Sequence, residues 1–191
     1  MKKEILHIKN MVCPRCITSV EDILHGLNVS FEKVELGDAL LNETLSADKI
    51  SALKDKLSKQ GFELLEDKKE KIVEAVKTHI IQLIKNSSSD HSTKLSSYLS
   101  KELGYDYSHI SSIFTASQGV TIEKYVILQK IEYVKELLSY NELTLSEISD
   151  KLHYSSLAAL SAQFKSITGT TPSQFKLLTD QGRKSLDNLI Q

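Results

Sequence analysis

The sequence predicts an α+β domain at the N-terminus, with the ferredoxin-like order βαββαβ, followed by an all-α domain with two helix-turn-helix units. Two observations predict this arrangement. Over residues 1–66, short segments of alternating apolar and polar residues are separated by segments with apolar residues at helical spacing. Farther along, one segment of the chain recurs at an offset of 49 or 50 positions. A chain of 191 residues is long enough for both domains, 1–66 and 67–191.

The N-terminal elements follow in order from their apolar patterns. The first helix is expected to begin at Pro14, because proline is pre-shaped for the first helical position. Gly37-Asp38 separates two strands as a hairpin turn, and Gly61 ends the second helix. We expect strands at residues 5–11, 29–36, 39–45 and 62–65, with helices carrying Ile17 to Leu27 and Ile50 to Leu57. This order is the split-βαβ arrangement.

Both cysteines of the chain lie at the start of the first helix, as Cys13 and Cys16. Sulfurs at this spacing can share a soft metal ion or form a bond with each other. The N-terminus of a helix stabilises a thiolate, and Arg15 adds positive charge nearby. Two thiolates without a third ligand suit Cu(I) or another soft ion better than Zn(II), which prefers four ligands.

The segment Asn10-Met11-Val12-Cys13-Pro14-Arg15-Cys16 resembles the Gly-Met-x-Cys-x-x-Cys motif of heavy-metal-associated (HMA) domains, the modules of copper chaperones and metal-pumping ATPases. Gly61-Phe62 matches the penultimate turn of that family, and Asn10 stands at the position of its glycine. The resemblance covers residues 1 to about 66. It implies that Cys13 and Cys16 are metal ligands, the first on the loop and the second in the first helical turn. Met11 is predicted to be a core residue under this loop.

Other interpretations of the cysteine pair remain open. Cys-Pro-Arg-Cys also resembles the Cys-Pro-x-Cys motif of thioredoxin-like oxidoreductases, although those usually carry an aromatic residue where Val12 stands here. The pair would then respond to the thiol–disulfide state instead of a metal. Another alternative is a metallochaperone or metal buffer with a helical partner-binding domain. A purely structural pair is the last, because cysteines can simply pack as small apolar residues.

The C-terminal half contains an internal repeat. Residues 99–105 correspond to residues 148–154 at an offset of 49, and after a one-residue slip the correspondence continues at an offset of 50. Each copy predicts a short helix, a tight turn and a second helix ended by glycine, which is the helix-turn-helix pattern. A long amphipathic helix from Ile122 to Leu138 joins the copies. A further helix begins at Asp67 and carries an apolar stripe from Ile72 to Ile84.

Residues from about 67 to 182 resemble the DNA-binding domain of AraC-type transcription regulators. The most specific stretch holds Phe164-Lys165 and Gly169-Thr170-Thr171-Pro172-Ser173, at the positions of the family's Phe-Lys, Gly and Thr-Pro-Ser. The resemblance implies that the second helix of each unit lies in the major groove of double-stranded DNA. It implies base-facing positions at Ser108, Ser111, Ser112, Leu157, Ala158, Ser161 and Ala162, and phosphate contacts at Thr121, Lys165 and Thr171.

The sequence departs from that family at positions that bear on DNA affinity. Ser112 and Ala162 stand where the family usually has arginine, so the two-pronged contact with guanine is missing. His153 replaces the turn glycine of the second unit. Residues 91–191 hold ten Lys or Arg and ten Asp or Glu residues, which gives no broad basic field. We expect DNA binding that is weak, A·T-leaning or dependent on a dimer; the alternative is that both units serve only as a packing scaffold.

The composition restricts the remaining function classes. The net charge of −1 and the 40% hydrophobic content are typical of a globular protein, and no stretch approaches the roughly 18 apolar residues of a membrane span. The sequence shows no paired carboxylates in a glycine-rich setting, no phosphate-cradling loop and no nucleophile beside a base, so an enzyme is not predicted. The favoured hypothesis is a cytoplasmic bacterial transcription regulator, without a membrane partner, that responds to Cu(I) or a similar soft ion. A homodimer would form where the cysteine pairs of two molecules share that ion.

Overall fold

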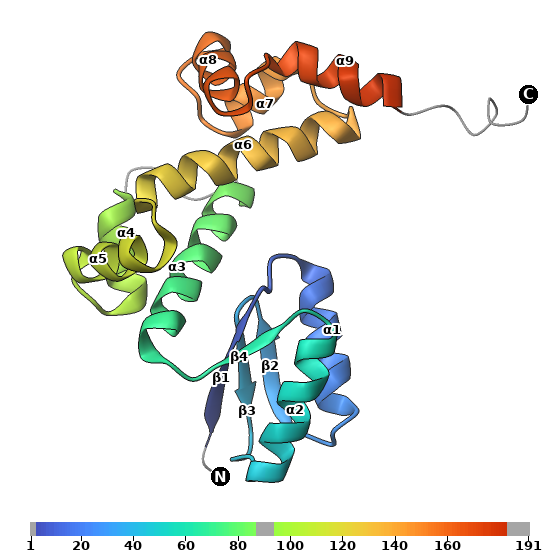
Figure 1. Cartoon of the computed structure of the whole chain (residues 1–191), viewed down its shortest axis with the longest axis vertical. Helices are drawn as coiled ribbons and strands as arrows, with labels where there is room; N and C mark the ends of the chain where they lie inside the picture. The colour runs from blue at the N-terminus through green and yellow to red at the C-terminus, as the bar shows by residue number, and fades with distance from the viewer. Residues whose placement is uncertain (1–2, 87–93, 183–191) are drawn as a thin grey trace, which may run out of the picture. The chain divides into compact units, whose positions relative to one another are not determined.

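The computed structural model describes residues 3–86 and 94–182 (Figure 1). In chain order the elements are β1 (Glu4–Lys9), α1 (Pro14–His25), β2 (Phe31–Glu35), β3 (Asp38–Leu41), α2 (Ala47–Lys59), β4 (Glu63–Leu65), α3 (Lys68–Lys85), α4 (Leu95–Leu103), α5 (Tyr107–Gln118), α6 (Ile122–Tyr140), α7 (Leu145–Lys151), α8 (Leu157–Thr168) and α9 (Pro172–Gly182). Residues 183–191, the end of the predicted C-terminal domain, lie outside the described residues. Within the described ranges, no helix has the length and apolar character needed to cross a membrane.

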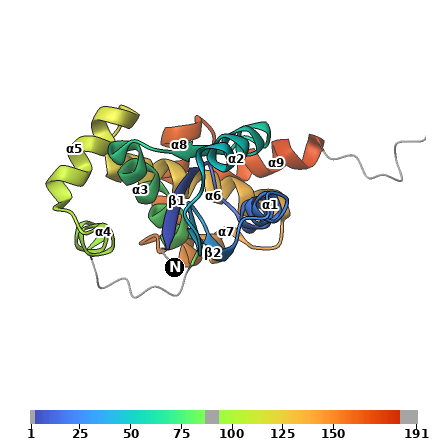
Figure 2. The ribbon, with the colours of Figure 1, turned by 90° about the horizontal axis from the view of Figure 1, so that it is seen from below.

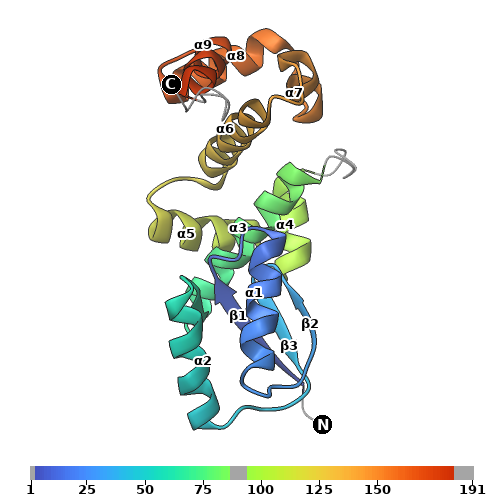
Figure 3. The same ribbon diagram turned by 90° about the vertical axis from the view of Figure 1, so that its right-hand side faces the viewer.

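The N-terminal part of the chain forms a small antiparallel sheet with the strand order β2-β3-β1-β4. In the register of β1, Leu6 lies opposite Ala39 on β3, and Ile8 lies opposite Leu64 on β4. α1 and α2 run side by side against one face of this sheet (Figure 3). The predicted α+β part with a four-stranded antiparallel sheet is therefore confirmed.

The core of this part lies between the sheet and the two helices. Leu6 and Ile8 on β1 are buried, whereas Ile5, the residue before Leu6, is 55% exposed, as expected for a strand whose side chains alternate between two faces. Met11 is 1% exposed, which confirms its predicted place in the core. The buried members are Leu6, Ile8, Met11, Val20, Ile23, Leu24, Val29, Val34, Ala39, Leu41, Leu45, Leu53, Leu57 and Phe62.

β1 ends two residues earlier than the alternation from Ile5 to Met11 predicts. Asn10 has a φ of +71°, which takes the backbone out of the extended conformation and directs the chain into the loop before α1. Met11 therefore reaches the core from the loop and not from the strand. The apolar pattern correctly predicted that Met11 is buried, but it could not show the turn at Asn10 that precedes it.

α3 begins where the sequence predicts. The Asp67 Oδ1 accepts hydrogen bonds from the backbone N–H groups of Lys69 (2.8 Å) and Glu70 (3.1 Å), which satisfies donors that have no partner within the helix. α3 lies on the opposite side of β1 from α1 (Figures 1 and 2). Its buried apolar side chains belong to the predicted stripe, and they are Ile72, Val73, Val76, Ile80 and Ile84.

Two helix-turn-helix pairs follow, α4 with α5 and α7 with α8. The residues that the sequence repeat aligns are buried at equivalent places in both pairs. In the first pair they are Leu99, Ile110 and Phe114, and in the second Ile148, Leu160 and Phe164, all of them 0% exposed. The helical C-terminal part with two such units is therefore confirmed.

The chain divides into two compact units. The first comprises residues 1–82 and 90–121, and so contains the sheet, most of α3 and the pair α4–α5. The second comprises residues 83–89 and 122–191, with α6 to α9. These limits describe compactness, and the division into folding domains at residues 66 and 67 stays a prediction.

Candidate functional site

The cysteine loop is held at the N-terminus of α1. Cys13 is the N-cap residue of α1 and is extended, with φ −152° and ψ 164°, and Pro14 follows at the first helical position. The Cys16 backbone N–H donates to the Cys13 carbonyl oxygen at 2.9 Å, which closes the first turn of the helix. Both cysteines are half-buried and neither is in a disulfide. The loop and the first helical turn thus present both sulfurs at one end of α1.

The two sulfurs lie within reach of one common partner. The Cys13 and Cys16 Sγ atoms are 3.3 Å apart. This exceeds the roughly 2.05 Å of a disulfide bond and is less than the roughly 4.6 Å that two sulfurs, each about 2.3 Å from an ion, would span in a linear arrangement. A small rotation of either side chain therefore reaches a disulfide or a two-coordinate ion. The donor set fits a soft ion.

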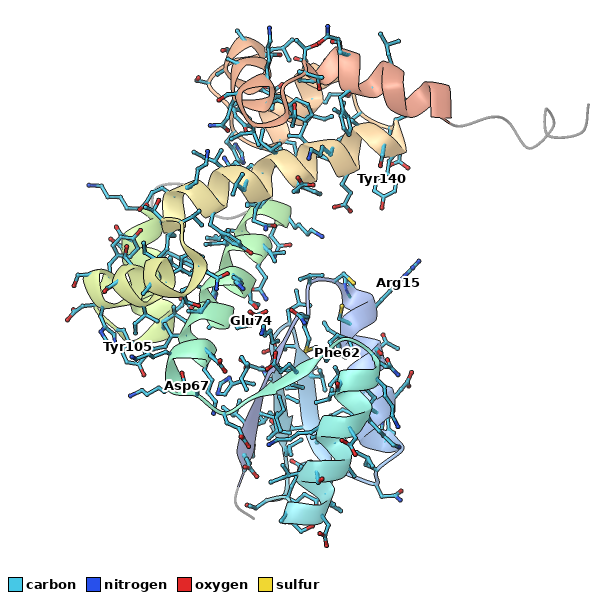
Figure 4. The ribbon with its side chains drawn as sticks, viewed as in Figure 1. Arg15, Phe62, Asp67, Glu74, Tyr105 and Tyr140 are labelled. Atoms are coloured by element: carbon cyan, nitrogen blue, oxygen red, sulfur yellow. The ribbon has the colours of Figure 1, made fainter. Side chains whose placement is uncertain are left out.

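The surroundings of the pair add no further metal ligands. Among residues 3–86 and 94–182, no group of three or more His, Cys, Asp or Glu side chains is arranged to hold a metal ion. Val12, beside Cys13, is 46% exposed. Arg15 points outward from α1 in Figure 4. A metal ion at this site would thus receive two sulfurs from one chain.

Asn10 connects the cysteine loop to its neighbours. Its φ of +71° lies in the left-handed region, where asparagine is tolerated better than most residues. The Asn10 Nδ2 donates to the Gly61 carbonyl oxygen at 2.8 Å, and its own carbonyl oxygen lies 4.0 Å from the Cys16 Sγ. Its backbone N–H donates to the Glu74 Oε1 at 3.0 Å. The left-handed backbone at this position favours glycine or asparagine over most other residues.

Sequence reasoning missed Glu74. The residue is 9% exposed although it is charged, and it reaches the loop from α3, on the side of the helix that faces the sheet (Figure 4). Its position between Val73 and Val76 in the apolar stripe is the one signal in the sequence, because a carboxylate beside a buried stripe needs a partner. The pattern could not say that this partner is a backbone group 64 positions earlier.

A polar cavity of about 140 Å³ lies between the sheet and α3. His7 and Asp38 line it from β1 and β3, with the His7 Nδ1 2.7 Å from the Asp38 Oδ1, and Glu74 and His79 line it from α3. Burial lowers the pKa of His79, and the carboxylates of Glu102 and Asp38 act in the opposite direction. The cavity between the sheet and α3 is therefore lined by polar groups, and one of them, His79, is partly removed from water.

The first helix-turn-helix unit presents most of its predicted contact residues to solvent. Gly104, with φ +70°, ends α4, and α5 begins after Asp106. Ser108 and Ser112 on α5 are exposed, and Thr121 before α6 is exposed as well. Ser111 is half-buried. The predicted base-facing residues of this unit lie on one helix, and their contact with DNA stays a prediction.

The second unit carries its predicted residues on α8. The Ser156 Oγ accepts a hydrogen bond from the Ala159 N–H at 3.1 Å and so caps α8 at its first turn. Leu157 is 43% exposed. The other predicted residues are exposed at Ala158, Ala162 and Lys165, and half-buried at Ser161 and Thr171. The Thr171 Oγ1 accepts from the Gln174 N–H at 3.2 Å, so this hydroxyl already caps α9.

Lys130 on α6 was also missed by the sequence analysis. Its Nζ donates to the Leu152 carbonyl oxygen at 2.9 Å and lies 5.3 Å from the centre of the Tyr154 ring. Burial lowers the pKa of Lys130. The Tyr154 hydroxyl donates in turn to the Gln163 Oε1 on α8 at 2.7 Å. The Lys130 ammonium group therefore contacts the turn between α7 and α8 through the Leu152 carbonyl group and the Tyr154 ring.

Comparison with known proteins supports the assignment of the C-terminal half. Residues 99–177 match the family model of a helix-turn-helix domain. An HTH-type transcriptional regulator of Staphylococcus aureus strain MSSA476 is 35% identical over 80 residues, which are 42% of this chain and 11% of that protein. This chain thus spans about a tenth of that relative's length. The prediction of a helix-turn-helix domain in the C-terminal half is confirmed by the family match.

Comparison with solved structures found similarity to two bacterial proteins. The C-terminal domain of AraT, a response regulator from Geobacillus stearothermophilus, is 20% identical with a TM-score of 0.49, over 61% of this chain and 89% of that one. A transcriptional regulator of Chromobacterium violaceum, described as having an AraC-type DNA-binding domain, is 15% identical with a TM-score of 0.48, over 57% of this chain and 96% of that one.

Proposed function

We propose that this protein is a bacterial, cytoplasmic transcription regulator of AraC type whose binding to double-stranded DNA depends on the state of Cys13 and Cys16. The observation that carries the proposal is the 3.3 Å separation of the two sulfurs at the N-terminus of a helix, in a chain that also holds a helix-turn-helix domain. The signal is Cu(I) or another soft ion, with Zn(II) less suited. No catalytic step is part of this function.

The proposed DNA contacts come from α5 and α8. Ser108, Ser111, Ser112, Leu157, Ala158, Ser161 and Ala162 face the bases, and Thr121, Lys165 and Thr171 contact phosphates. The exposed Leu157 and the small side chains of α8 support this role, because apolar groups at the start of a recognition helix can contact thymine methyl groups. Without arginine at Ser112 and Ala162, binding is weak and A·T-leaning, or requires a dimer.

The proposed sensor is an HMA-like domain of ferredoxin-like fold. The strand order β2-β3-β1-β4 with α1 and α2 on one face supports that fold, and the presence of both half-buried sulfurs at one end of α1 supports the metal role. A bound ion would link the two sulfurs and fix their separation. Cys13 and Cys16 would hold it, and Asn10 would set the path of the loop behind them.

A homodimer is part of the proposal. One chain offers an ion two sulfurs, and the described residues hold no further ligand cluster beside them. The cysteine pair of a second molecule could then complete the coordination. A dimer would also raise the affinity of two weak DNA-binding domains for adjacent sites.

Thiol–disulfide sensing is a second candidate, favoured by the short distance between the sulfurs. At 3.3 Å they are already in contact, so a disulfide needs only a small rotation. A third candidate, a metallochaperone or buffer, differs in that it binds metal without binding DNA. The three candidates predict different responses of DNA binding, which one experiment can separate.

The experiment captures genomic DNA fragments with the reduced chain, with and without one molar equivalent of Cu(I), and identifies them by sequencing. The same capture uses Zn(II) in place of Cu(I), and the chain oxidised with diamide. The test variant is Cys13→Ser with Cys16→Ser. The matched control is Val12→Ser, which changes an exposed residue of the same loop and leaves both sulfurs in place.

The metal hypothesis expects a fragment set that changes with Cu(I) in the parent chain and in Val12→Ser, but not in the double variant. A response to diamide alone would support redox sensing instead. Tight Cu(I) binding without any captured DNA would support the metallochaperone. A response to Cu(I) that survives in the double variant would contradict the assignment of Cys13 and Cys16.

A further inference from the structure

We infer that Glu74 is a positioning residue of the cysteine loop, and that α3 carries the state of that loop to α4, the first helix of the first helix-turn-helix unit. The inference rests on the proposed function in one respect, because it takes Cys13 and Cys16 as the site where the signal arrives. All the residues involved lie in the first compact unit.

The first link is the contact between Glu74 and Asn10. The Glu74 Oε1 accepts from the Asn10 N–H at 3.0 Å, and its Oε2 lies 3.5 Å from the Lys77 Nζ on the same helix. Each oxygen of this buried carboxylate therefore has a partner, as a charge removed from water requires. A charged acceptor makes the hydrogen bond to the backbone stronger than a neutral one would. Glu74 thus fixes α3 to the residue at which β1 ends and the loop begins.

The second link runs from Asn10 to the sulfurs. The carbonyl oxygen of Asn10 lies 4.0 Å from the Cys16 Sγ, while its side chain donates to the Gly61 carbonyl oxygen. Asn10 therefore contacts the cysteine pair through its carbonyl group and α3 through its N–H group. Capture of an ion, or formation of a disulfide, moves the Cys16 sulfur and changes the first of these contacts. Because the Asn10 backbone is in the left-handed region, it has little freedom to absorb that change.

The third link joins α3 to α4. The His79 Nδ1 lies 3.0 Å from the Tyr98 hydroxyl, and the two rings meet edge to face, with centroids 5.6 Å apart and planes at 80°. His79 follows Glu74 by five positions, about 7.5 Å along the helix axis. A shift of α3 at Glu74 would therefore reach His79 less than two helical turns away, and His79 contacts α4, the first helix of the helix-turn-helix unit.

The links carry a signal only if their strengths differ between the empty and the loaded loop. The bond from Glu74 to Asn10 meets this condition, since it depends on where the Asn10 backbone lies. Glu70 lies one turn earlier on α3, where its side chain is exposed and its backbone N–H donates to the Asp67 Oδ1 at the start of the helix. Glu70 therefore provides a matched control with the same change in charge.

The test measures hydrogen exchange of backbone amides in the full chain, reduced, with and without one equivalent of Cu(I). In the parent chain we expect Cu(I) to change exchange rates in the loop 10–16, in α3 from residue 72 to 80 and in α4, by about fivefold or more, the lower end of typical couplings. In Glu74→Ala the loop should still respond, while the response of α3 and α4 is lost. Glu70→Ala should behave as the parent chain.

Two further variants separate coupling from simple damage to the fold. Glu74→Gln keeps an oxygen that can accept from the Asn10 N–H, so it should restore the response of α3 that Glu74→Ala loses. Tyr98→Phe keeps the ring contact but removes the hydroxyl, so α3 should respond and α4 should respond less. This graded pattern is not expected from a general loss of stability.

The outcomes distinguish this inference from the proposed function. Two outcomes would overturn the inference but leave the proposed function standing. In the first, Cu(I) changes hydrogen exchange in the loop of the parent chain but not in α3. In the second, α3 still responds fully to Cu(I) in Glu74→Ala. A parent chain whose loop is unchanged by Cu(I) would remove the metal hypothesis, and a loop unchanged by both Cu(I) and diamide oxidation would remove the inference as well. The same comparison on the diamide-oxidised chain then tests whether the disulfide is the signal that α3 receives.

Discussion

Lys130 on α6 donates a hydrogen bond from its Nζ to the carbonyl oxygen of Leu152 at 2.9 Å, at the point where α7 ends. The ammonium group also lies over the ring of Tyr154, two residues farther along. The half-buried Lys130 therefore links the long helix of the second compact unit to the turn of the second helix-turn-helix pair. Both contacts lie in the segment that joins α7 to α8.

Lys130→Met should lower the free energy of unfolding by about 1–3 kcal/mol, since it removes a charge-assisted hydrogen bond and a cation–π contact at a partly buried site. The control is Lys135→Met on the same helix, whose ion pair with Glu132 lies near the surface and should contribute less than about 1 kcal/mol. Urea unfolding followed by circular dichroism measures both. Equal decreases in the free energy of unfolding of the two variants would show that the contact with Leu152 stabilises the fold no more than a surface ion pair does.

Gly104→Ala should destabilise the first helix-turn-helix unit by about 1–2 kcal/mol. The added Cβ meets no atom within 4 Å, so the cost comes from the left-handed backbone, with φ +70°, and not from a clash. Gly104→Asn should cost less, because asparagine adopts this conformation more readily. Thermal unfolding of the three chains gives the order; a loss for Asn as large as that for Ala would contradict the explanation.

The free energy of unfolding should fall on acidification because of His79. Burial holds the pKa of His79 below its ordinary value of 6.5, so the unfolded chain binds its proton at a pH where the folded chain does not. Stability from this group is complete above pH 6.5 and is lost as the pH falls from 6.5 toward the lower folded pKa. Urea unfolding at pH 7.5 and pH 5.5 tests this. The parent chain should lose more stability than His79→Gln, whereas equal losses would assign the effect to other groups.

Ala162→Arg should strengthen DNA binding and shift its sequence preference. The position is exposed on α8 and is one where the AraC-type family usually carries arginine, which bonds guanine through two donors and contributes about 1–3 kcal/mol of discrimination. Ser51→Arg on α2, also exposed, adds the same charge outside the helix-turn-helix units. Selection from a random DNA pool compares them. Enrichment of guanine by both variants, or by neither, would argue against α8 as a base-reading helix.

The sequence predicted those features that a periodic pattern or a single residue type determines. The apolar stripe of α3, the cap at Asp67 and the buried Met11 follow from such local signals. The partners of Glu74 and Lys130 did not, because each is a backbone group far along the chain, and backbone groups leave no mark in the pattern of side chains. The left-handed conformations of Asn10 and His153 could be suspected only from the glycines that the two families place there.

The two helix-turn-helix units both have apolar residues at the buried positions that correspond, but they differ at two exposed positions of α5 and α8. Leu99, Ile110 and Phe114 correspond to Ile148, Leu160 and Phe164, while the exposed Ser108 and Ser112 correspond to Ala158 and Ala162. Packing constrains only the interior set, so the outer faces are free to diverge after a duplication. A regulator of this kind would recognise an asymmetric operator with two dissimilar halves, whereas two identical reading heads related by symmetry would favour a palindrome.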